Sequence, residues 1–247
     1  MTRIALVSDI HGNAPALRAF LQELPGLGAD QVVNLGDIAS GGVDPRGTLD
    51  LLRGLPGVIT IRGNHERQVL GWAGPMGASD RLAASVLTDE DSEWLAGLPA
   101  TVEIVPGVLA FHGTPDDDLQ YLLHTVTTDG LRDATDEEVV DRLGESYGRY
   151  GVFVCGHSHL QRQRRLPDGS LVVNPGSVGW PAYSADTPFP HVVEAGTPDA
   201  RFTILDSSAG GWRVTERMLP YDTAAAASYA EANSRPDVVR ALLTGRV

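Results

Sequence analysis

The chain has 247 residues, of which 42% are apolar and 21% are charged, so it has enough apolar sequence to bury one sizeable core. This composition excludes a collagen, a disulfide-dense scaffold and a wholly disordered chain. The formal net charge of −13 disfavours binding to long nucleic acids, because such binding needs many basic residues against the phosphate backbone. All 19 basic residues are Arg, which excludes a P-loop lysine and a lysine Schiff base.

Three short apolar runs in the first quarter of the chain predict buried strands at residues 3–8, 31–35 and 57–61. Helices are expected between them, one running from an Asn13 cap to about Glu23 and another at 46–53. Strands that alternate with helices predict a mainly parallel sheet with helices on its faces.

The pattern changes after residue 100. Residues 101–105 and 108–112 flank Pro106-Gly107 and predict a hairpin. The acidic, Gly-poor segment 115–148 predicts an inserted helical cap, and the Ala-rich segment 222–244 predicts two helices separated at Pro236. Further strands are expected at 151–155, 160–166, 170–174 and 201–218. Because no long linker interrupts this order, we expect one domain spanning 1–247.

Two features of the sequence bear on location. Cys155 is the single cysteine, so an intrachain disulfide is excluded. The few residues before Ile4 are too short for a signal-peptide core, and no apolar run approaches the 18 residues of a membrane span. We therefore expect a cytoplasmic protein with no membrane partner.

Polar residues of an unusual kind follow the predicted strands. They are Asp9, His11, Asp37, Asn64, His65, His112, His157 and His159. A single histidine near a strand end is more often a structural residue than a ligand, but five of the seven histidines occupy such positions. Because the carboxyl ends of parallel strands form ligand sites, we expect these side chains to converge.

This set of donors is typical of a metal site. Borderline divalent ions accept imidazole nitrogen and carboxylate oxygen together, and about eight donors are too many for one ion. Paired ions are a recurrent device for phosphoester hydrolysis. The donor set favours two divalent ions, with manganese placed ahead of iron, zinc and nickel.

Five blocks in order resemble the motifs of the calcineurin-like metallophosphoesterase superfamily. They are Asp9-Ile10-His11, Gly36-Asp37, Gly63-Asn64-His65-Glu66, His112-Gly113 and Gly156-His157-Ser158-His159. The later Asn174-Pro175-Gly176-Ser177 resembles a phrase of the small bacterial members, the YfcE-like group. The resemblance implies a four-layer αββα sandwich of two mixed β-sheets flanked by helices.

The resemblance also implies roles for the eight residues. Asp9, His11 and His159 would bind one ion, and Asn64, His112 and His157 the other. Asp37 would bridge both ions together with a water or hydroxide, and His65 would face the substrate phosphate as the catalytic residue.

One position departs from the family pattern. Some members carry an Asp three residues after the bridging Asp, where it orients the catalytic histidine, and this chain has Ser40 there. Glu66 and Asp44 are the candidates to replace it.

The leading functional prediction is a phosphoesterase that cleaves diesters or monoesters of a small, nucleotide-type substrate. A protein Ser/Thr phosphatase or a dinucleoside polyphosphate hydrolase is the alternative, followed by a catalytically silent, metal-stabilised scaffold. Trp180 and Tyr183 are candidates either to stack on a base or to pack in the core. Arg62 either contacts the substrate phosphate or only lies in solvent at the edge of the site. The 222–244 segment either closes the fold or forms a homodimer contact.

Overall fold

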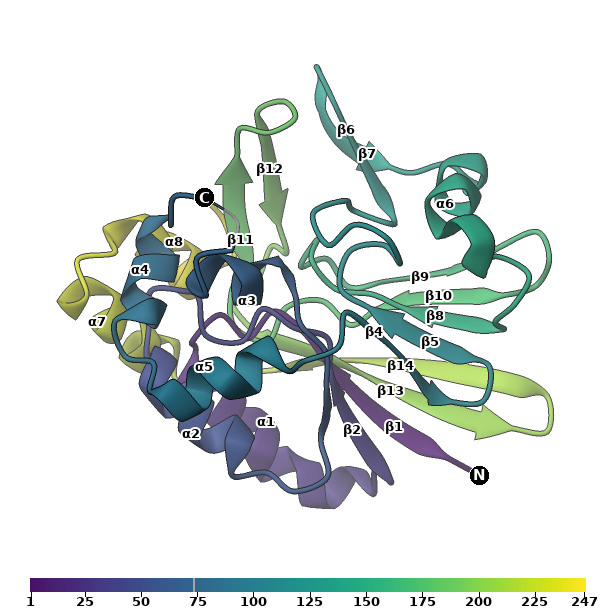
Figure 1. Ribbon diagram of the computed structural model, residues 1–247, viewed down its shortest axis with the longest axis horizontal. Coiled ribbons are helices and arrows are strands. Elements are labelled where there is room, and N and C mark those ends of the chain that lie inside the picture. Colours follow the sequence, from purple (N-terminus) through teal and green to yellow (C-terminus); the bar gives the residue numbers. More distant parts are fainter. Residues whose placement is uncertain (73) are drawn as a thin grey trace.

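The computed structural model describes residues 1–72 and 74–247 and has two five-stranded mixed sheets at its centre (Figure 1). The first sheet contains, in spatial order, β14 (Gly211–Leu219), β13 (Ala200–Ser208), β1 (Arg3–Val7), β2 (Gln31–Asn34) and β3 (Ile59–Thr60). The second contains β4 (Thr101–Val105), β5 (Val108–Phe111), β8 (Val152–Val154), β10 (Leu171–Asn174) and β9 (Arg162–Arg165). Strands β1, β2 and β3 are parallel, as are β5, β8 and β10. The other four strands, β13, β14, β4 and β9, pair antiparallel with their neighbours.

Alternation along the strands builds the layers, because successive side chains point to opposite faces of a sheet. In β1, Ile4 and Leu6 pack between the sheets, whereas Ala5 and Val7 face a helical layer. In β5, Val108 packs in the core between the two sheets, whereas Leu109 faces the other side of its sheet and packs in a separate apolar cluster. The result is the predicted αββα sandwich.

Helices cover the outer faces of both sheets. Figure 1 shows α1 (Ala14–Leu27), α2 (Pro45–Arg53) and α5 (Asp89–Ala96) beside the first sheet, and α6 (Asp136–Leu143) beyond the second. Asn13 caps α1 as expected, since its Oδ1 accepts a hydrogen bond from the Ala16 amide at 3.1 Å. Helix α1 continues past the expected end at Glu23, because Leu24 and Leu27 extend the face that packs on the core.

The predicted break at Pro236 is confirmed. Helix α7 (Thr223–Ala232) ends before it, and α8 (Pro236–Thr244) begins with the proline at a position where no amide hydrogen is needed. Ala226, Ala230 and Leu242 of these helices pack with Val43, so the segment closes the fold over the loop before α2. The dimer contact stays a prediction.

The segment 115–148 differs from the expected helical cap. It contains one full helix, α6, followed by a short 3-10 turn, and before α6 lies the hairpin β6 (His124–Thr127) and β7 (Gly130–Asp133). The β-branched run Thr125-Val126-Thr127 and the turn at Thr128-Asp129, followed by Gly130, favour strands over helix.

Other elements were not anticipated. They are α3 (Asn64–Val69), α4 (Ala78–Ala84) and the hairpin of β11 (Ala182–Ala185) and β12 (His191–Glu194), in addition to α5. Both hairpins project from the same end of the molecule (Figure 1). No helix in the described residues has the length and apolar character needed to cross a bilayer.

Candidate metal centre

The eight polar residues singled out in the sequence lie in loops that leave the carboxyl ends of strands in both sheets. Asp9 and His11 follow β1, and Asp37 follows β2. Asn64 and His65 begin α3 after β3, where the chain turns at Gly63. His112 follows β5, and His157 and His159 follow β8. The two packed sheets therefore bring together residues up to 150 positions apart.

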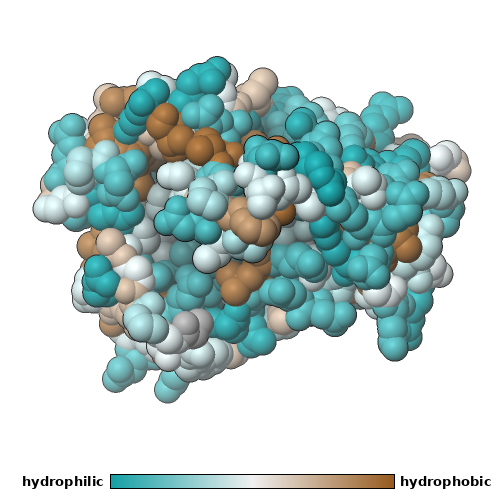
Figure 2. Space-filling model, turned by 90° about the horizontal axis from the view of Figure 1, so that it is seen from above, coloured by the Kyte–Doolittle hydropathy of each residue, from teal (hydrophilic) through white to brown (hydrophobic). Residues whose placement is uncertain are grey.

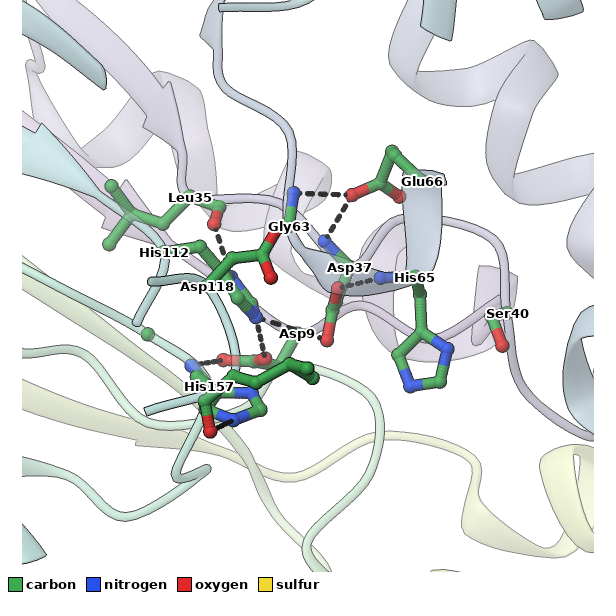
Figure 3. A network of polar contacts seen from close by, with 12 residues as sticks. Asp9, Leu35, Asp37, Ser40, Gly63, His65, Glu66, His112, Asp118 and His157 are labelled. Atoms are coloured by element: carbon green, nitrogen blue, oxygen red, sulfur yellow. Dashed lines mark hydrogen bonds and ion pairs between the residues drawn. The ribbon is translucent and has the colours of Figure 1, made fainter. Parts of the chain in front are cut away.

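The functional atoms of these side chains face one another. Nε2 of His112 lies 3.2 Å from Oδ2 of Asp37 (Figure 3). Nε2 of His159 lies 3.4 Å from Oδ1 of Asp9. Nε2 of His11 lies 3.8 Å from Oδ2 of Asp37. Asp9, Asp37 and His112 are almost fully buried, so these contacts are shielded from solvent.

The outer ring nitrogen of each inward-facing histidine is held by a backbone carbonyl. Ring nitrogens of His11, His112, His157 and His159 lie 2.6, 2.7, 3.0 and 2.6 Å from the carbonyl oxygens of Ser40, Leu35, Leu119 and Trp180 respectively. Because only a ring N–H can donate to a carbonyl, the other nitrogen of each ring faces the centre and carries a lone pair whenever the ring is neutral.

Two of these lone pairs face each other. Nε2 of His11 and Nε2 of His159 are 3.0 Å apart, and both rings use Nδ1 as the donor to a carbonyl. Two unprotonated nitrogens at this distance repel unless a cation or a proton lies beside them. Their arrangement is that of two ligands of one metal ion.

Three oxygen and nitrogen atoms in the centre make no well-aligned hydrogen bond among the described residues, although two of them lie close to a facing Asp or His side chain. They are Oδ1 of Asp9, Oδ1 of Asn64 and Nε2 of His112, all buried. A buried polar atom left without a partner costs about 1–3 kcal/mol. Oxygen and imidazole donors fit a divalent ion of the borderline kind, so the residues present suit the metals implied by the sequence.

Three sets of His and Asp side chains have ligand atoms within 4.8 Å of one another. They are Asp9-His11-His159, Asp37-His112-His157 and His11-Asp37-His65. Each set could hold a metal ion. The first two contain no residue in common, and Asp37 connects the second to the third.

The backbone at these positions adopts an uncommon conformation. Asp9, His11, Asp37, His157 and His159 all have φ between 50° and 66°. Ser234 is the other non-glycine residue in the described chain with positive φ. Such conformations cost free energy and cluster at functional sites, because the surrounding structure must enforce them.

Glycines permit the close packing of these loops. A Cβ at Gly63 would lie 2.2 Å from Oδ1 of Asp37, and a Cβ at Gly156 would lie 2.0 Å from Oγ of Ser8. Any side chain at either position would therefore displace the loops that carry the ligands.

Opposite charges shift the pKa values in the centre. Burial opposes the charged form of Asp37, but the facing imidazoles of His112 and His65 outweigh it and hold its pKa well below the usual range. Burial likewise opposes protonation of His112, yet the negative charges of Asp37 and Asp9 raise its pKa to about 10. The two carboxylates are therefore ionised at neutral pH and attract cations.

His65 is oriented by a residue that the sequence did not suggest. Its Nδ1 lies 2.7 Å from Oδ1 of Asp80, and the same oxygen accepts a hydrogen bond from Oγ of Ser40 at 2.7 Å. Asp80 is 5% exposed and belongs to α4, where Oδ2 also accepts the Gly77 amide. The sequence around Asp80 is typical of the first turn of a helix, but it does not show that the carboxylate contacts His65.

Neither residue proposed as a substitute performs this role. Glu66 accepts hydrogen bonds from the amides of Asp37, Ile38 and Gly63, and so braces the loop that carries Asp37 (Figure 3). Asp44 caps α2 through the Gly47 amide. Both predictions are wrong, because capping of nearby amides uses these carboxylates.

The later motif supports the ligand loops from outside. Oγ of Ser177 donates to the carbonyl oxygen of Asp9 at 2.8 Å, and Nδ2 of Asn174 donates to the carbonyl oxygen of Gly156 at 2.6 Å. The segment 174–177 thus fixes both loops.

A cavity of about 590 Å³ opens beside the centre, where His11, Asp37, His65, His157 and His159 form part of its wall. The remainder comes from 117–126, Arg142 and 180–188. Trp180 and Tyr183 line it, so neither is confined to the core. A second pocket of about 240 Å³ reaches His112 and includes Arg62 in its lining.

Comparison with known proteins assigns the chain to a family. Residues 2–161 match the family model described as calcineurin-like phosphoesterase. The chain belongs to this family. It is 30% identical to the uncharacterised protein MJ0912 of Methanocaldococcus jannaschii over 203 residues, which are 72% of this chain and 76% of that protein.

The solved structure of a metallophosphoesterase shares the fold. A metallophosphoesterase from Sphaerobacter thermophilus aligns with a TM-score of 0.74 and 22% identity over 99% of this chain and 100% of its own. The phosphoesterase Yfce from E. coli is a more distant neighbour, with a TM-score of 0.47 and 19% identity over 83% of this chain and 88% of its own. The family predicted from the five motif blocks is confirmed, and this calcineurin-like phosphoesterase is a metal-dependent phosphoester hydrolase.

Proposed function

We propose that this calcineurin-like phosphoesterase uses two divalent metal ions to hydrolyse diester or monoester bonds of a small, nucleotide-type substrate. The observation that carries the proposal is the convergence of two separate ligand sets, Asp9-His11-His159 and Asp37-His112-His157, at one end of the two sheets. The unpartnered Oδ1 of Asn64 supports its inclusion with the second set.

Asp37 is the residue we assign to both ions. Its Oδ2 lies within 4 Å of Nε2 of His112 and of Nε2 of His11, which belong to different sets. A carboxylate has two oxygens and can serve two cations at once. Bound at these sites, divalent ions supply positive charge that stabilises phosphoryl oxygens and generates a nucleophilic water at neutral pH.

His65 is the residue we assign to proton transfer. Burial opposes its protonation, but Asp37 and Asp80 outweigh this and raise its pKa to about 8, which keeps the ring protonated near neutral pH. It lies on the cavity wall, with Nδ1 held by Asp80. Nε2 is then the nitrogen available to protonate the leaving oxygen of the ester.

The choice of manganese over iron, zinc and nickel stays a prediction, as does the cytoplasmic location. The donor set of imidazole, carboxylate and amide oxygen suits several of these metals.

Hydrolysis of bis(4-nitrophenyl) phosphate and of 4-nitrophenyl phosphate tests the proposal, with each of the four metals added separately. Metal-dependent turnover that falls at least about a thousandfold in Asp37→Asn is the expected result. The control is Asp89→Asn, which removes an exposed carboxylate from the first turn of α5 and should retain activity.

The metal content of both variants, measured by mass spectrometry, separates loss of ions from loss of folding. Metal-loaded protein that hydrolyses neither ester with any of the four ions would contradict the proposal and favour the scaffold alternative. Faster turnover of a phosphopeptide or a dinucleoside polyphosphate would favour the corresponding alternative.

A further inference from the structure

The large cavity beside the metal centre has an apolar and aromatic lining. Leu119, Tyr121, Val126, Tyr183 and Pro188 contribute to its wall together with the histidines of the centre. They come from the two projecting hairpins and the loops that precede them (Figure 1). Its volume of about 590 Å³ is in the range of sites for small organic molecules.

Aromatic rings connect this lining directly to the metal centre. The ring of Tyr183 lies 4.6 Å from that of His159, and the ring of Tyr121 lies 4.9 Å from that of His157. The two tyrosine hydroxyls are 2.6 Å apart, and that of Tyr121 is 3.0 Å from Nε2 of His191. Because these hydroxyls already have partners, the tyrosines present mainly ring carbon to a ligand.

The cavity offers no free cation beyond the centre among the residues described as lining it. Arg142 is the arginine in its wall, and its guanidinium donates to the carbonyl oxygens of Tyr121, Leu122 and His124 at 2.9–3.1 Å. It also donates to Oγ1 of Thr125 at 2.6 Å. These contacts hold the loop before β6 in place, so the guanidinium is engaged with the protein and does not offer a free charge to a ligand.

Acidic residues lie where the cavity meets the smaller pocket. Asp117 lines both, and Asp116 and Asp118 line the smaller one. Arg67 is paired with Asp118 at 2.5 Å, so that charge is balanced locally. A substrate tail carrying further negative charge would therefore meet carboxylates and ring carbon instead of basic side chains.

We propose that the cavity receives an uncharged, largely apolar organic group attached to the reacting phosphate, such as an aryl or short alkyl group. This inference rests on the proposed function, because the metal centre must hold the phosphate while the cavity holds the organic group. The inference restricts the proposed substrates to esters whose only charged group is the reacting phosphate, and it disfavours polyphosphates. Leu119 in the lining is 55% exposed, and Phe189, which follows the lining residue Pro188, is 42% exposed, so apolar side chains are available where such a group would enter. Figure 2 looks onto this end of the molecule and shows apolar patches within a largely hydrophilic face.

Binding of three phosphonates to the manganese-loaded protein, measured by calorimetry, tests the inference. Phenylphosphonate, methylphosphonate and 4-carboxyphenylphosphonate carry the same anchoring group and a single organic substituent each. Phenylphosphonate should bind at least about tenfold more tightly than methylphosphonate, and about tenfold more tightly than the carboxyphenyl compound.

Val126→Arg adds a positive charge to the lining and should make the carboxyphenyl compound bind more tightly than phenylphosphonate. Val192→Arg is the matched control, because Val192 is 48% exposed on β12 and is not among the lining residues. It should preserve the order of the unmodified protein.

Equal binding of phenyl- and methylphosphonate within twofold would overturn the inference, as would tightest binding of the carboxyphenyl compound to the unmodified protein. Failure of the proposed function is a different result, namely no hydrolysis of either nitrophenyl ester. Selective binding of phenylphosphonate without hydrolysis would retain the ligand class and reject catalysis.

Discussion

Replacing Asp80 with alanine removes the carboxylate that holds Nδ1 of His65 at 2.7 Å. It leaves the eight predicted site residues unchanged and removes two other contacts of Asp80, with Oγ of Ser40 and the Gly77 amide. The variant therefore tests whether the position of the His65 ring matters to the reaction.

The magnitude follows from the contact that is lost. A hydrogen bond to a charged group contributes about 1.5–3 kcal/mol, which corresponds to about 10- to 150-fold in rate if the contact is fully used in the transition state. Loss of the Asp80 charge also lowers the pKa of His65, which burial, Asp37 and Asp80 together set at about 8. Since a general acid must be protonated, the alkaline limb of the rate profile should move to lower pH.

The assay compares two phosphomonoesters on metal-loaded protein. Phenyl phosphate has a poor leaving group that needs protonation, whereas 4-nitrophenyl phosphate has a good one. Asp80→Ala should lower kcat for phenyl phosphate by about 10- to 150-fold and change kcat for the nitrophenyl ester by about threefold or less. Ser40→Ala is the control, because it keeps the contact of Asp80 with His65.

An equal loss on both esters, with unchanged metal content, would refute the assignment of Asp80 as the positioning residue for a general acid. A second variant guards against a purely structural effect. Ser40→Asp in the Asp80→Ala background places a carboxylate at the neighbouring position, and recovery of phenyl phosphate turnover would support positioning of the ring.

The remaining predictions concern the metals and stability. Chelation followed by manganese should raise the melting temperature of the unmodified protein but not of Asp9→Asn, as measured by differential scanning fluorimetry, because the ions relieve repulsion between the buried carboxylates. Metal affinity measured by calorimetry should increase from pH 7 to pH 9, since binding must displace a proton from His112, whose pKa is raised to about 10 against burial by Asp37 and Asp9. Asp91→Ala should cost about 1–3 kcal/mol in urea unfolding, because buried Asp91 holds both Arg46 and Arg53. Burial opposes the charge of Asp91, but Arg46 outweighs it and lowers the pKa, so this contribution should be present near neutral pH and lost only in strong acid.

Local sequence signals accounted for most of the framework and for the members of the site. Short continuous apolar runs located β1, β2, β5, β8 and β10, since a strand covered on both faces is apolar at nearly every position. The histidines, aspartates and Asn64 could be selected because each follows such a run. Their convergence is a consequence of parallel pairing, which places the strand ends at one edge.

Short elements without a strong pattern could not be located this way. Helices α3 and α4 have six and seven residues, too few for an apolar period to emerge. The hairpin of β6 and β7 lies in a segment whose acidic, Gly-poor composition predicts helix, although its β-branched run and its turn before Gly130 are strand signals.

Residue type and order along the chain were enough to predict which side chains converge and to which family the chain belongs, because the candidate metal donors are few in kind and follow the strands in order. The surroundings of these side chains could be read only from the folded chain. Asp80 reaches His65 across 15 residues of chain, and Tyr121 meets Tyr183 across 62, through the packing of separate loops. These neighbours depend on how segments far apart in the chain pack together, and a local sequence pattern carries no information about that packing.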